Sequence, residues 1–204
     1  ESIVLAARRA VEPRPLEGAD VVVTAGATAE PIDPVRVLGS RASGKTGREV
    51  ATACHALGAD VTLIRAGGTA AGAPPAITAR SVETAAEMAD AVETAVDGAD
   101  ALLSAAAIGD YTVEPAPEKI RSGQTDLTLE LEPTPKVLDS VRAAHPELPI
   151  VGFKVETAGD DTDVIDAARR LRDRLDLAFV VANRASVMGK DETRAHLVDE
   201  DSAE

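Results

Sequence analysis

The sequence contains very few aromatic and sulfur-containing side chains. Its 204 residues include two phenylalanines, one tyrosine, no tryptophan and a single cysteine, Cys54. One cysteine excludes an intramolecular disulfide, and a metal site that used it would need ligands of another type. The three histidines, at positions 55, 145 and 196, are scattered without metal-ligand spacing. Cys54 lies within a helical pattern and is typical of a small core residue there.

Long hydrophobic runs are also lacking. No apolar stretch is long enough to cross a membrane, and no signal peptide is visible. We therefore expect a cytoplasmic protein without a membrane partner.

Positive charge is scarce. The net charge is −14 and the pI is about 4.6, which argues against nucleic acid as a partner. Only five of the 21 basic residues are lysines. Many acids, few lysines and abundant alanine, valine and threonine favour a halophilic protein, because high salt screens repulsion among surface charges. The alternative is an ordinary acidic protein.

The chain does contain the alternation of strands and helices that is typical of an α/β domain. Repeated βα units predict a Rossmann-like, mainly parallel sheet with helices on both faces. Leucines alternate strictly over 127–131, which predicts an antiparallel strand within an arm around 111–131. We expect helices at 1–10, 44–57, 84–96, 135–144 and 161–174, and strands at 20–24, 61–64, 76–82, 101–105, 150–153, 177–182 and 195–198.

The length suits one such domain with a sizeable core. Residues 11–18 form a Pro-punctuated connector, and the chain begins with Glu1 rather than Met. We interpret 1–17 as a linker from a missing N-terminal domain and 18–204 as a nucleotide-binding domain.

The segment from Val22 to Gly47 is the most informative part of the chain. A buried strand ends at Gly26, and a small-residue turn (Ser43, Gly44, Lys45, Thr46, Gly47) opens the next helix. Unpaired N–H groups and the helix dipole favour an anion at such a helix start, and Lys45 adds a positive charge. The segment predicts a site for a nucleotide or a phosphorylated metabolite. The alternative is an ordinary strand–loop–helix in which the glycines only turn the chain.

Four other residues have both a functional and a structural interpretation. Asp110, after a strand end, can hold Mg²⁺ that bridges phosphates, or it can stabilise a turn. Lys119, on a later loop, can close over a polyphosphate or remain solvated. Phe153 can stack on a base or pack in the core. Asn183, the only asparagine, can hydrogen-bond a carbonyl or phosphate oxygen or stabilise a turn.

No Ser-His-Asp arrangement with recognisable local motifs is present, and no covalent nucleophile is evident. The sequence therefore suits a reaction in which two substrates attack each other. The protein would position them and neutralise charge.

Six short segments stand out together: TAGATAEPIDPVR (24–36), SRASGKTG (40–47), AAAIGDY (105–111), PEKIR (117–121), VGFKVET (151–157) and LDLAFVVAN (175–183). Their order and spacing resemble the phosphopantothenoylcysteine synthetase family, the phosphopantothenate–cysteine ligases of coenzyme A biosynthesis. The resemblance covers about residues 16–199. In many microbes this enzyme is the C-terminal half of a bifunctional protein that begins with a flavin-dependent decarboxylase.

The resemblance implies a two-step reaction. 4′-Phosphopantothenate attacks the α-phosphate of CTP (ATP in some eukaryotic members), and an acyl-cytidylate and pyrophosphate form with the help of Mg²⁺. The amine of L-cysteine then attacks the acyl carbon, and CMP leaves. Family members form homodimers in which an arm of one chain completes the site of its neighbour, and residues 111–131 would be that arm.

The resemblance also implies roles for individual residues. Lys119 would close over the triphosphate, Phe153 would pack on the base, and Asn183 would reach the phosphopantothenate side. Asp110 would face the metal or the ribose. The remaining contacts to nucleotide and phosphates would come from Ser43, Gly44, Lys45, Thr46, Gly47, Ala105, Ala106, Ile108, Thr134, Pro135, Lys136 and Val137.

The sequence departs from the bacterial pattern at several of these positions. Ser40 replaces an asparagine that assists the second step, so either Ser40 or a neighbour such as Arg41 would stabilise the oxyanion. Ala27 and Ala29 replace a glycine and an arginine. Two triphosphate-contacting lysines correspond to Arg169 and Asp173, of which only Arg169 keeps the charge, and Arg172 is a candidate replacement. These changes fit an archaeal-type variant.

Two other functions stay open. The run from Thr24 to Thr28 resembles the first turn of NAD(P)-dependent reductases, although no G-x-G-x-x-G opens the helix and Tyr111 lacks a lysine four residues later. The loss of asparagine at position 40 would suit a non-catalytic nucleotide-binding module. Protection from melting by NADPH or by CTP·Mg²⁺ distinguishes a reductase from a ligase.

Overall fold

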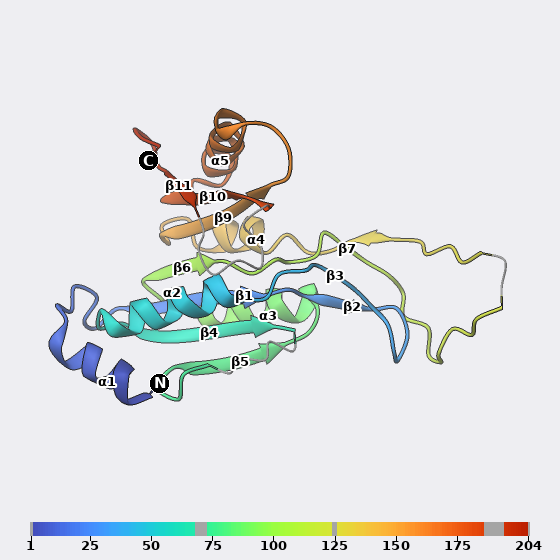
Figure 1. Ribbon diagram of the computed structural model, residues 1–204, viewed down its shortest axis with the longest axis horizontal. Coiled ribbons are helices and arrows are strands. Elements are labelled where there is room, and N and C mark those ends of the chain that lie inside the picture. Colours follow the sequence, from blue (N-terminus) through green and yellow to red (C-terminus); the bar gives the residue numbers. More distant parts are fainter. Residues whose placement is uncertain (1, 68–72, 124–125, 186–193, 204) are drawn as a thin grey trace.

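A seven-stranded sheet forms the centre of the computed structural model, which describes residues 2–67, 73–123, 126–185 and 194–203. The strand order is β11-β10-β9-β6-β1-β4-β5. All neighbouring strands are parallel except β10 and β11, which are antiparallel. The predicted mainly parallel sheet is therefore confirmed (Figure 1). The strands are β1 (Asp20–Gly26), β4 (Asp60–Ala66), β5 (Thr78–Val82), β6 (Ala101–Ser104), β9 (Ile150–Glu156), β10 (Phe179–Arg184) and β11 (Ala195–Val198).

Helices cover both faces of this sheet. Helix α2 (Lys45–Ala56) packs on one face, against β1 and β4, where Val21, Val23 and Leu63 point toward it. The opposite face carries α3 (Ala85–Val96), α4 (Val137–Ala144) and α5 (Asp161–Leu175). Alternate residues of β1 thus enter two different cores, as the period of two in a strand requires.

Helix α3 begins after Thr84, at the start of the helix expected over 84–96. The Thr84 hydroxyl accepts the N–H of Glu87 at 3.1 Å. The Glu87 carboxylate, however, accepts the N–H of Glu83 at 2.7 Å, one residue before the position expected of a capping box. A complete capping box is present instead at α5, between Asp160 and Asp163.

Two small antiparallel sheets extend from the carboxyl ends of the central strands. The first is a hairpin of β2 (Ala29–Pro31) and β3 (Val37–Gly39). The second pairs β7 (Tyr111–Thr112) with β8 (Glu132–Pro133), at the base of the predicted arm. In Figure 1 the yellow-green chain between β7 and β8 projects away from the sheet.

The strand predicted at 127–131 is wrong. Residues 126–131 have no strand partner, and Leu127 and Leu131 are 49% and 46% exposed. Alternating leucines stabilise a strand only where a sheet or core covers one face, and no described part of this chain supplies that cover.

Helix α1 (Ser2–Val11) packs on α2 through Leu5 and Arg9. The Arg9 guanidinium donates to the carbonyls of His55 (2.7 Å), Ala59 (2.8 Å) and Gly58 (3.0 Å), and it contacts His55 Nδ1 at 3.0 Å. A cation is favourable here because the last carbonyls of α2 lack partners within the helix. The linker interpretation of residues 1–17 stays a prediction.

Acid should weaken this contact. Burial, and then the charge of Arg9, lower the pKa of His55, so the folded state takes up this proton less readily than the unfolded chain. The stability is complete above about pH 6.5 and is lost as the pH falls towards the lowered value. Thermal melts between about pH 8 and pH 5 should show a smaller loss of Tm in His55→Gln than in the wild-type. Equal losses would contradict this assignment.

Candidate functional site

The polar and small residues predicted to bind a ligand gather at the carboxyl edge of the sheet. From β1 the chain proceeds to β4 and β5 on one side, and from β6 to β9 and β10 on the other. The direction reverses between β1 and β6, and doubly wound folds bind their ligands outside the carboxyl ends of the strands at such a point. Gly26 ends β1, Ala105 follows β6, and Asn183 is the second-last residue of β10. Phe153 was predicted to end its strand but lies in the middle of β9, which continues to Glu156.

The ends of β1 and β6 are tied together beyond the sheet. The Ala107 N–H donates to the Gly26 carbonyl at 2.8 Å, and the Thr28 N–H donates to the Ala107 carbonyl at 3.2 Å. Two threonine hydroxyls add to these bonds, because Thr24 accepts the N–H of Ala106 (3.1 Å) and Thr28 that of Gly109 (2.8 Å). Residues 105–109 are thus held as a small-residue floor at the switch point.

Glycines at 26 and 47 allow the backbone segments to approach closely. Gly26 has φ of 87°, and a Cβ there would overlap the Ala66 carbonyl oxygen. A Cβ on Gly47 would lie 2.6 Å from both the Ala25 side chain and the Thr24 carbonyl oxygen. The first turn of α2 therefore packs directly against the carboxyl end of β1.

The start of α2 has the form expected of an anion site. Its N-cap is Gly44 in the left-handed region, and no side chain caps the helix. The Ser43 hydroxyl accepts only a long hydrogen bond from the Lys45 N–H, at 3.5 Å. Ser40 lies in the preceding loop, exposed, with its hydroxyl accepting the Ala42 N–H at 3.1 Å.

Two predicted nucleotide-contacting turns meet next to this floor. The Lys136 ammonium forms an ion pair with the Asp110 carboxylate, and both side chains are largely exposed. Buried Thr134 donates its hydroxyl to the Gly109 carbonyl at 2.5 Å and its N–H to the Asp110 carbonyl at 3.1 Å. Asp110, Thr134 and Lys136 thus form one cluster, although they are far apart in the sequence.

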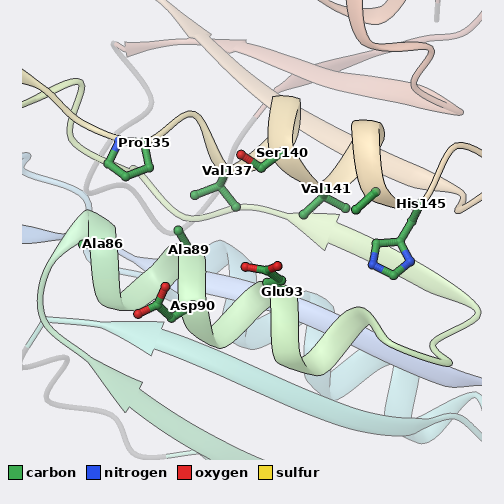
Figure 2. A pocket seen from close by; sticks show the side chains of 10 residues that line it. Ala86, Ala89, Asp90, Glu93, Pro135, Val137, Ser140, Val141 and His145 are labelled. Atoms are coloured by element: carbon green, nitrogen blue, oxygen red, sulfur yellow. The ribbon is translucent and has the colours of Figure 1, made fainter.

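Pro135 and Val137 face the other way. They line a pocket of about 250 Å³ between α3 and α4, which Figure 2 shows together with Ala89 and Val141. This pocket lies between helices and not where the strand ends converge. The cluster at Asp110 therefore agrees better with the geometry of a doubly wound site.

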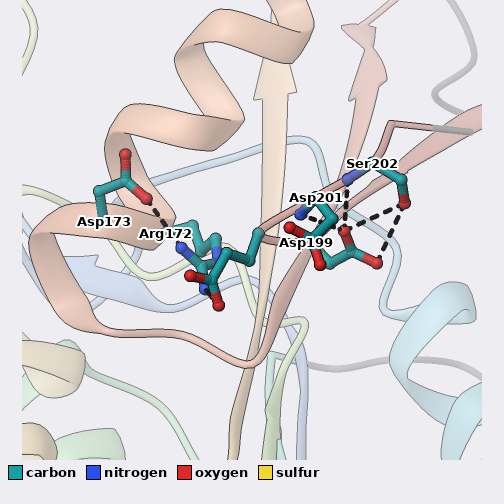
Figure 3. A network of polar contacts seen from close by, with 6 residues as sticks. Arg172, Asp173, Asp199, Asp201 and Ser202 are labelled. Atoms are coloured by element: carbon teal, nitrogen blue, oxygen red, sulfur yellow. Dashed lines mark hydrogen bonds and ion pairs between the residues drawn. The ribbon is translucent and has the colours of Figure 1, made fainter.

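Other predicted residues lie outside this cluster. Lys119 is exposed, in the arm between β7 and β8. Figure 1 shows that this arm projects away from the central sheet. Arg169 lies in the middle of α5, where its partner is Asp166 at 3.7 Å. Arg172, near the end of α5, pairs with Asp173 at 3.0 Å and with a glutamate of the C-terminal segment at 3.5 Å (Figure 3).

Phe153 and Asn183 lie on neighbouring strands, partly buried. In register, Phe153 is beside Val181, and Asn183 is beside Val155. These four residues belong to the sheet face that α2 covers farther along, but no described helix covers it here. The position leaves Phe153 partly accessible, as a base-stacking residue must be.

The sequence analysis missed two buried carboxylates beside the site. Glu30 is 3% exposed, and it accepts the N–H of Ala85 at 2.8 Å and the Thr112 hydroxyl at 3.0 Å. Asp33 is also 3% exposed and binds residues of the arm. Both lie in segment 24–36, on either side of Pro31 and Ile32. Two acids so close together in a stretch of mostly small or apolar residues were the sequence feature that could have indicated them.

A metal has one evident ligand in the site. Among the described residues, no three His, Cys, Asp or Glu side chains converge. The predicted ligand Asp110 lies at this edge, and one carboxylate would be compatible with Mg²⁺, which commonly takes one or two and completes its shell with phosphates and water. No described helix is long and apolar enough to span a bilayer.

The fold and the position of the candidate site define a protein of the doubly wound α/β class, and comparison with known proteins identifies the family. Residues 16–204 match the DNA/pantothenate metabolism flavoprotein C-terminal domain, and the chain belongs to this family. It is 42% identical over 207 residues to the coenzyme A biosynthesis bifunctional protein CoaBC of Thermococcus kodakarensis. That match covers all of this chain and 50% of the relative, so the chain spans about half the length of this curated relative.

Solved structures agree with this assignment. The C-terminal domain of a coenzyme A biosynthesis bifunctional protein CoaBC superposes with a TM-score of 0.77 at 28% identity, covering 93% of this chain and 85% of that one. A Cab2 mutant in complex with phosphopantothenate-cysteine has a TM-score of 0.73 at 17% identity, covering 100% and 83%, and shares the fold.

The crowding at Gly26 gives a stability test. Gly26→Ala should cost more than about 3 kcal/mol, because left-handed strain is added to a backbone clash. Gly98→Ala is the matched control: its φ is 81°, nothing lies within 4 Å of the added Cβ, and a cost of about 1 kcal/mol is expected. Urea denaturation measures both, and equal losses would show that the β1 end is not closely packed.

Proposed function

We propose that this domain joins 4′-phosphopantothenate to L-cysteine with CTP, as the ligase domain of a coenzyme A biosynthesis protein in the cytoplasm. The observation that supports this most is the placement of the ligase-like segments. The segments that contain Gly26, Ala105 and Asn183 lie at the carboxyl edge of one sheet, and Phe153 lies on β9 of the same sheet. A longer protein with a fused flavin-dependent decarboxylase is part of the same proposal.

The chemistry proceeds by making a poor leaving group into a good one. A carboxylate oxygen of phosphopantothenate forms a bond to the α-phosphorus of CTP, and the bond to pyrophosphate breaks. The cysteine amine then forms a bond to the acyl carbon, loses a proton to solvent, and expels CMP. The protein must hold substrates with several negative charges in line and neutralise those charges.

The residues of the edge supply these functions. The N-terminus of α2 and Lys45 hold phosphates, since helix dipole and backbone N–H groups favour an anion there. Residues 105–108 lie against the nucleotide, because small side chains let a flat ligand approach the backbone. Phe153 packs on the base, and Asn183 reaches the phosphopantothenate. Arg169 is a secondary candidate for the triphosphate. Arg172 is not, because it pairs with Glu200 beside the end of β11, at the sheet edge opposite the site.

Mg²⁺ would be held by Asp110 together with phosphate oxygens. When bound, it supplies charge neutralisation at the phosphate that is attacked. The ion pair with Lys136 means that the Asp110 carboxylate already has a cation beside it, and Lys136 is near enough to turn to a phosphate instead.

We propose that the functional unit is a homodimer. Lys119 lies on an arm that leads away from its own sheet, so it would act in the site of a neighbouring chain (Figure 1). Large apolar side chains on the arm and on the β2–β3 hairpin are 46–65% exposed, as expected of a surface that a partner covers. They are Val35, Val37, Tyr111, Leu127 and Leu131. Light scattering in high salt measures the state, and a monomer would exclude this arrangement.

A reductase is disfavoured by the geometry. The connection between β1 and α2 includes the whole β2–β3 hairpin, so it is not the tight glycine-rich turn that holds a dinucleotide pyrophosphate. A binding module without turnover is distinguished by the assay below.

Pyrophosphate release at high salt tests the function. With phosphopantothenate and Mg²⁺ present, we expect release with one of CTP, ATP, GTP and UTP, and product once cysteine is added. Lys119→Gln should lower kcat/KM for that nucleotide by about 100-fold, since a cation facing the triphosphate is lost. The melting temperature should stay the same, because Lys119 is exposed. Kinetics equal to wild-type would remove Lys119 from the site, and no release with any nucleotide would exclude a ligase.

Ser40 is the second test. If its hydroxyl takes the place of the family asparagine, Ser40→Ala should form acyl-cytidylate at a normal rate but convert it slowly. Quenched-flow analysis of the intermediate, with and without cysteine, separates the two steps. The Ala42 N–H loses its acceptor, the Ser40 hydroxyl, in this variant, so Ser40→Thr, which keeps the hydroxyl, is the control. Unchanged product formation in Ser40→Ala would point to another donor such as Arg41.

A further inference from the structure

The turn between β2 and β3 is built around one fully buried carboxylate. The Asp33 side chain has 0% exposure. Its Oδ1 accepts the N–H groups of Val35 and Arg36, both at 2.8 Å. Its Oδ2 accepts Nε and Nη2 of Arg36, at 2.9 and 2.5 Å. The acid and the guanidinium therefore form one unit, in which two N–H groups of Arg36 donate to the same carboxylate oxygen.

This unit binds the arm at a single residue. Asp33 Oδ2 also accepts the N–H of Ile120 at 3.0 Å, and Arg36 Nη2 donates to the Ile120 carbonyl at 2.5 Å. Both backbone groups of Ile120 are thus occupied by one ion pair, 87 and 84 residues away in the chain. A further bond, from the Ala116 N–H to the Ile32 carbonyl at 2.9 Å, holds the arm four residues earlier.

The residue before Ile120 is Lys119. Its side chain is exposed, and among the described residues no hydrogen bond or ion pair holds its ammonium. The backbone on its C-terminal side is fixed while the charged end remains available. This is the geometry of a cation that is presented to a ligand from a rigid support.

We propose that Asp33 and Arg36 are positioning residues that fix where Lys119 is presented to the triphosphate. The inference rests on the proposed function and adds two residues that do not themselves have to touch the nucleotide. A carboxylate is required at position 33, because it accepts every one of these hydrogen bonds, whereas an amide would turn an NH₂ group toward donors. The Arg36 hydrogen bond also holds the pKa of Asp33 well below its usual range, so the unit stays ionised at neutral pH.

A double-mutant cycle tests whether Asp33 acts through Lys119. Asp33→Asn alone should lower kcat/KM for the nucleotide in pyrophosphate release by about ten- to a hundredfold. Adding Asp33→Asn to Lys119→Gln should change little, because the group it positions is already lost. Two effects that multiply in the double variant would overturn the proposal.

Limited proteolysis provides a readout that does not need turnover. Lysyl endopeptidase cuts after lysine. The hydrogen bonds that Asp33 and Arg36 make with Ile120, here called the clamp, should protect the bond between Lys119 and Ile120. Mass spectrometry should show faster cleavage there in Asp33→Asn than in the wild-type. Arg36→Lys, which keeps the charge but loses the fork, serves if Asp33→Asn does not fold, and it should also cut faster. Wild-type cleavage rates in the folded variants would overturn the clamp.

Asp199→Asn is the matched control. Asp199 also accepts backbone N–H groups in a turn, from Asp201 at 2.9 Å and Ser202 at 2.7 Å (Figure 3). It follows β11, whose end lies beside the start of β10, at the sheet edge opposite the site. Cleavage at Lys119 and activity should both match the wild-type. If wild-type protein releases no pyrophosphate with any nucleotide, the proposed function fails, while the cleavage rates still decide the clamp.

Discussion

Four buried polar side chains between residues 24 and 33 must each find a hydrogen-bond partner, and this requirement organises the whole site. Thr24, Thr28, Glu30 and Asp33 are 0–3% exposed. Each takes a backbone N–H from a segment more than 50 residues away, at 106, 109, 85 and 120 respectively. A buried acceptor without a partner is costly, so this one stretch fixes the floor of the site, the start of α3 and the arm at once.

The sequence was sufficient for the regular part of the fold. The strands β1, β4 and β6 are short apolar runs between turn residues, and α3 (Ala85–Val96) lies within the helix expected over 84–96. Elements that depend on short-range sequence patterns were therefore predicted correctly. The strand at 127–131 was not, because an alternating pattern states only that one face is apolar and not that anything covers it. Leu127 and Leu131 are exposed, and no described part of the chain covers them.

The candidate site was predictable only where the residue type itself suggested a ligand. Lysines, an aspartate after a strand and a helix start were recognised as candidates for phosphate and metal. Glu30 and Asp33 were not, because their partners are separated by 55 to 87 residues and no local pattern announces them. The pairing of Asp110 with Lys136 was likewise not predictable from a local pattern. It depends on two turns that meet through Thr134, whose buried hydroxyl donates to the Gly109 carbonyl.

Charge explains why such positioning matters in this protein. With a net charge of −14, the surface repels a triphosphate, and salt that screens this repulsion also weakens attraction between exposed charges. Cations that bind phosphate must then act at short range and from fixed places. A lysine on a loose arm would spend little time in contact with a ligand. In the proposed arrangement Lys119 would lose less backbone freedom on binding, because Asp33 and Arg36 hold the N–H and carbonyl of Ile120 beside it. The excess of negative surface charge therefore accounts both for the scarcity of lysine and for the need to fix the backbone beside Lys119.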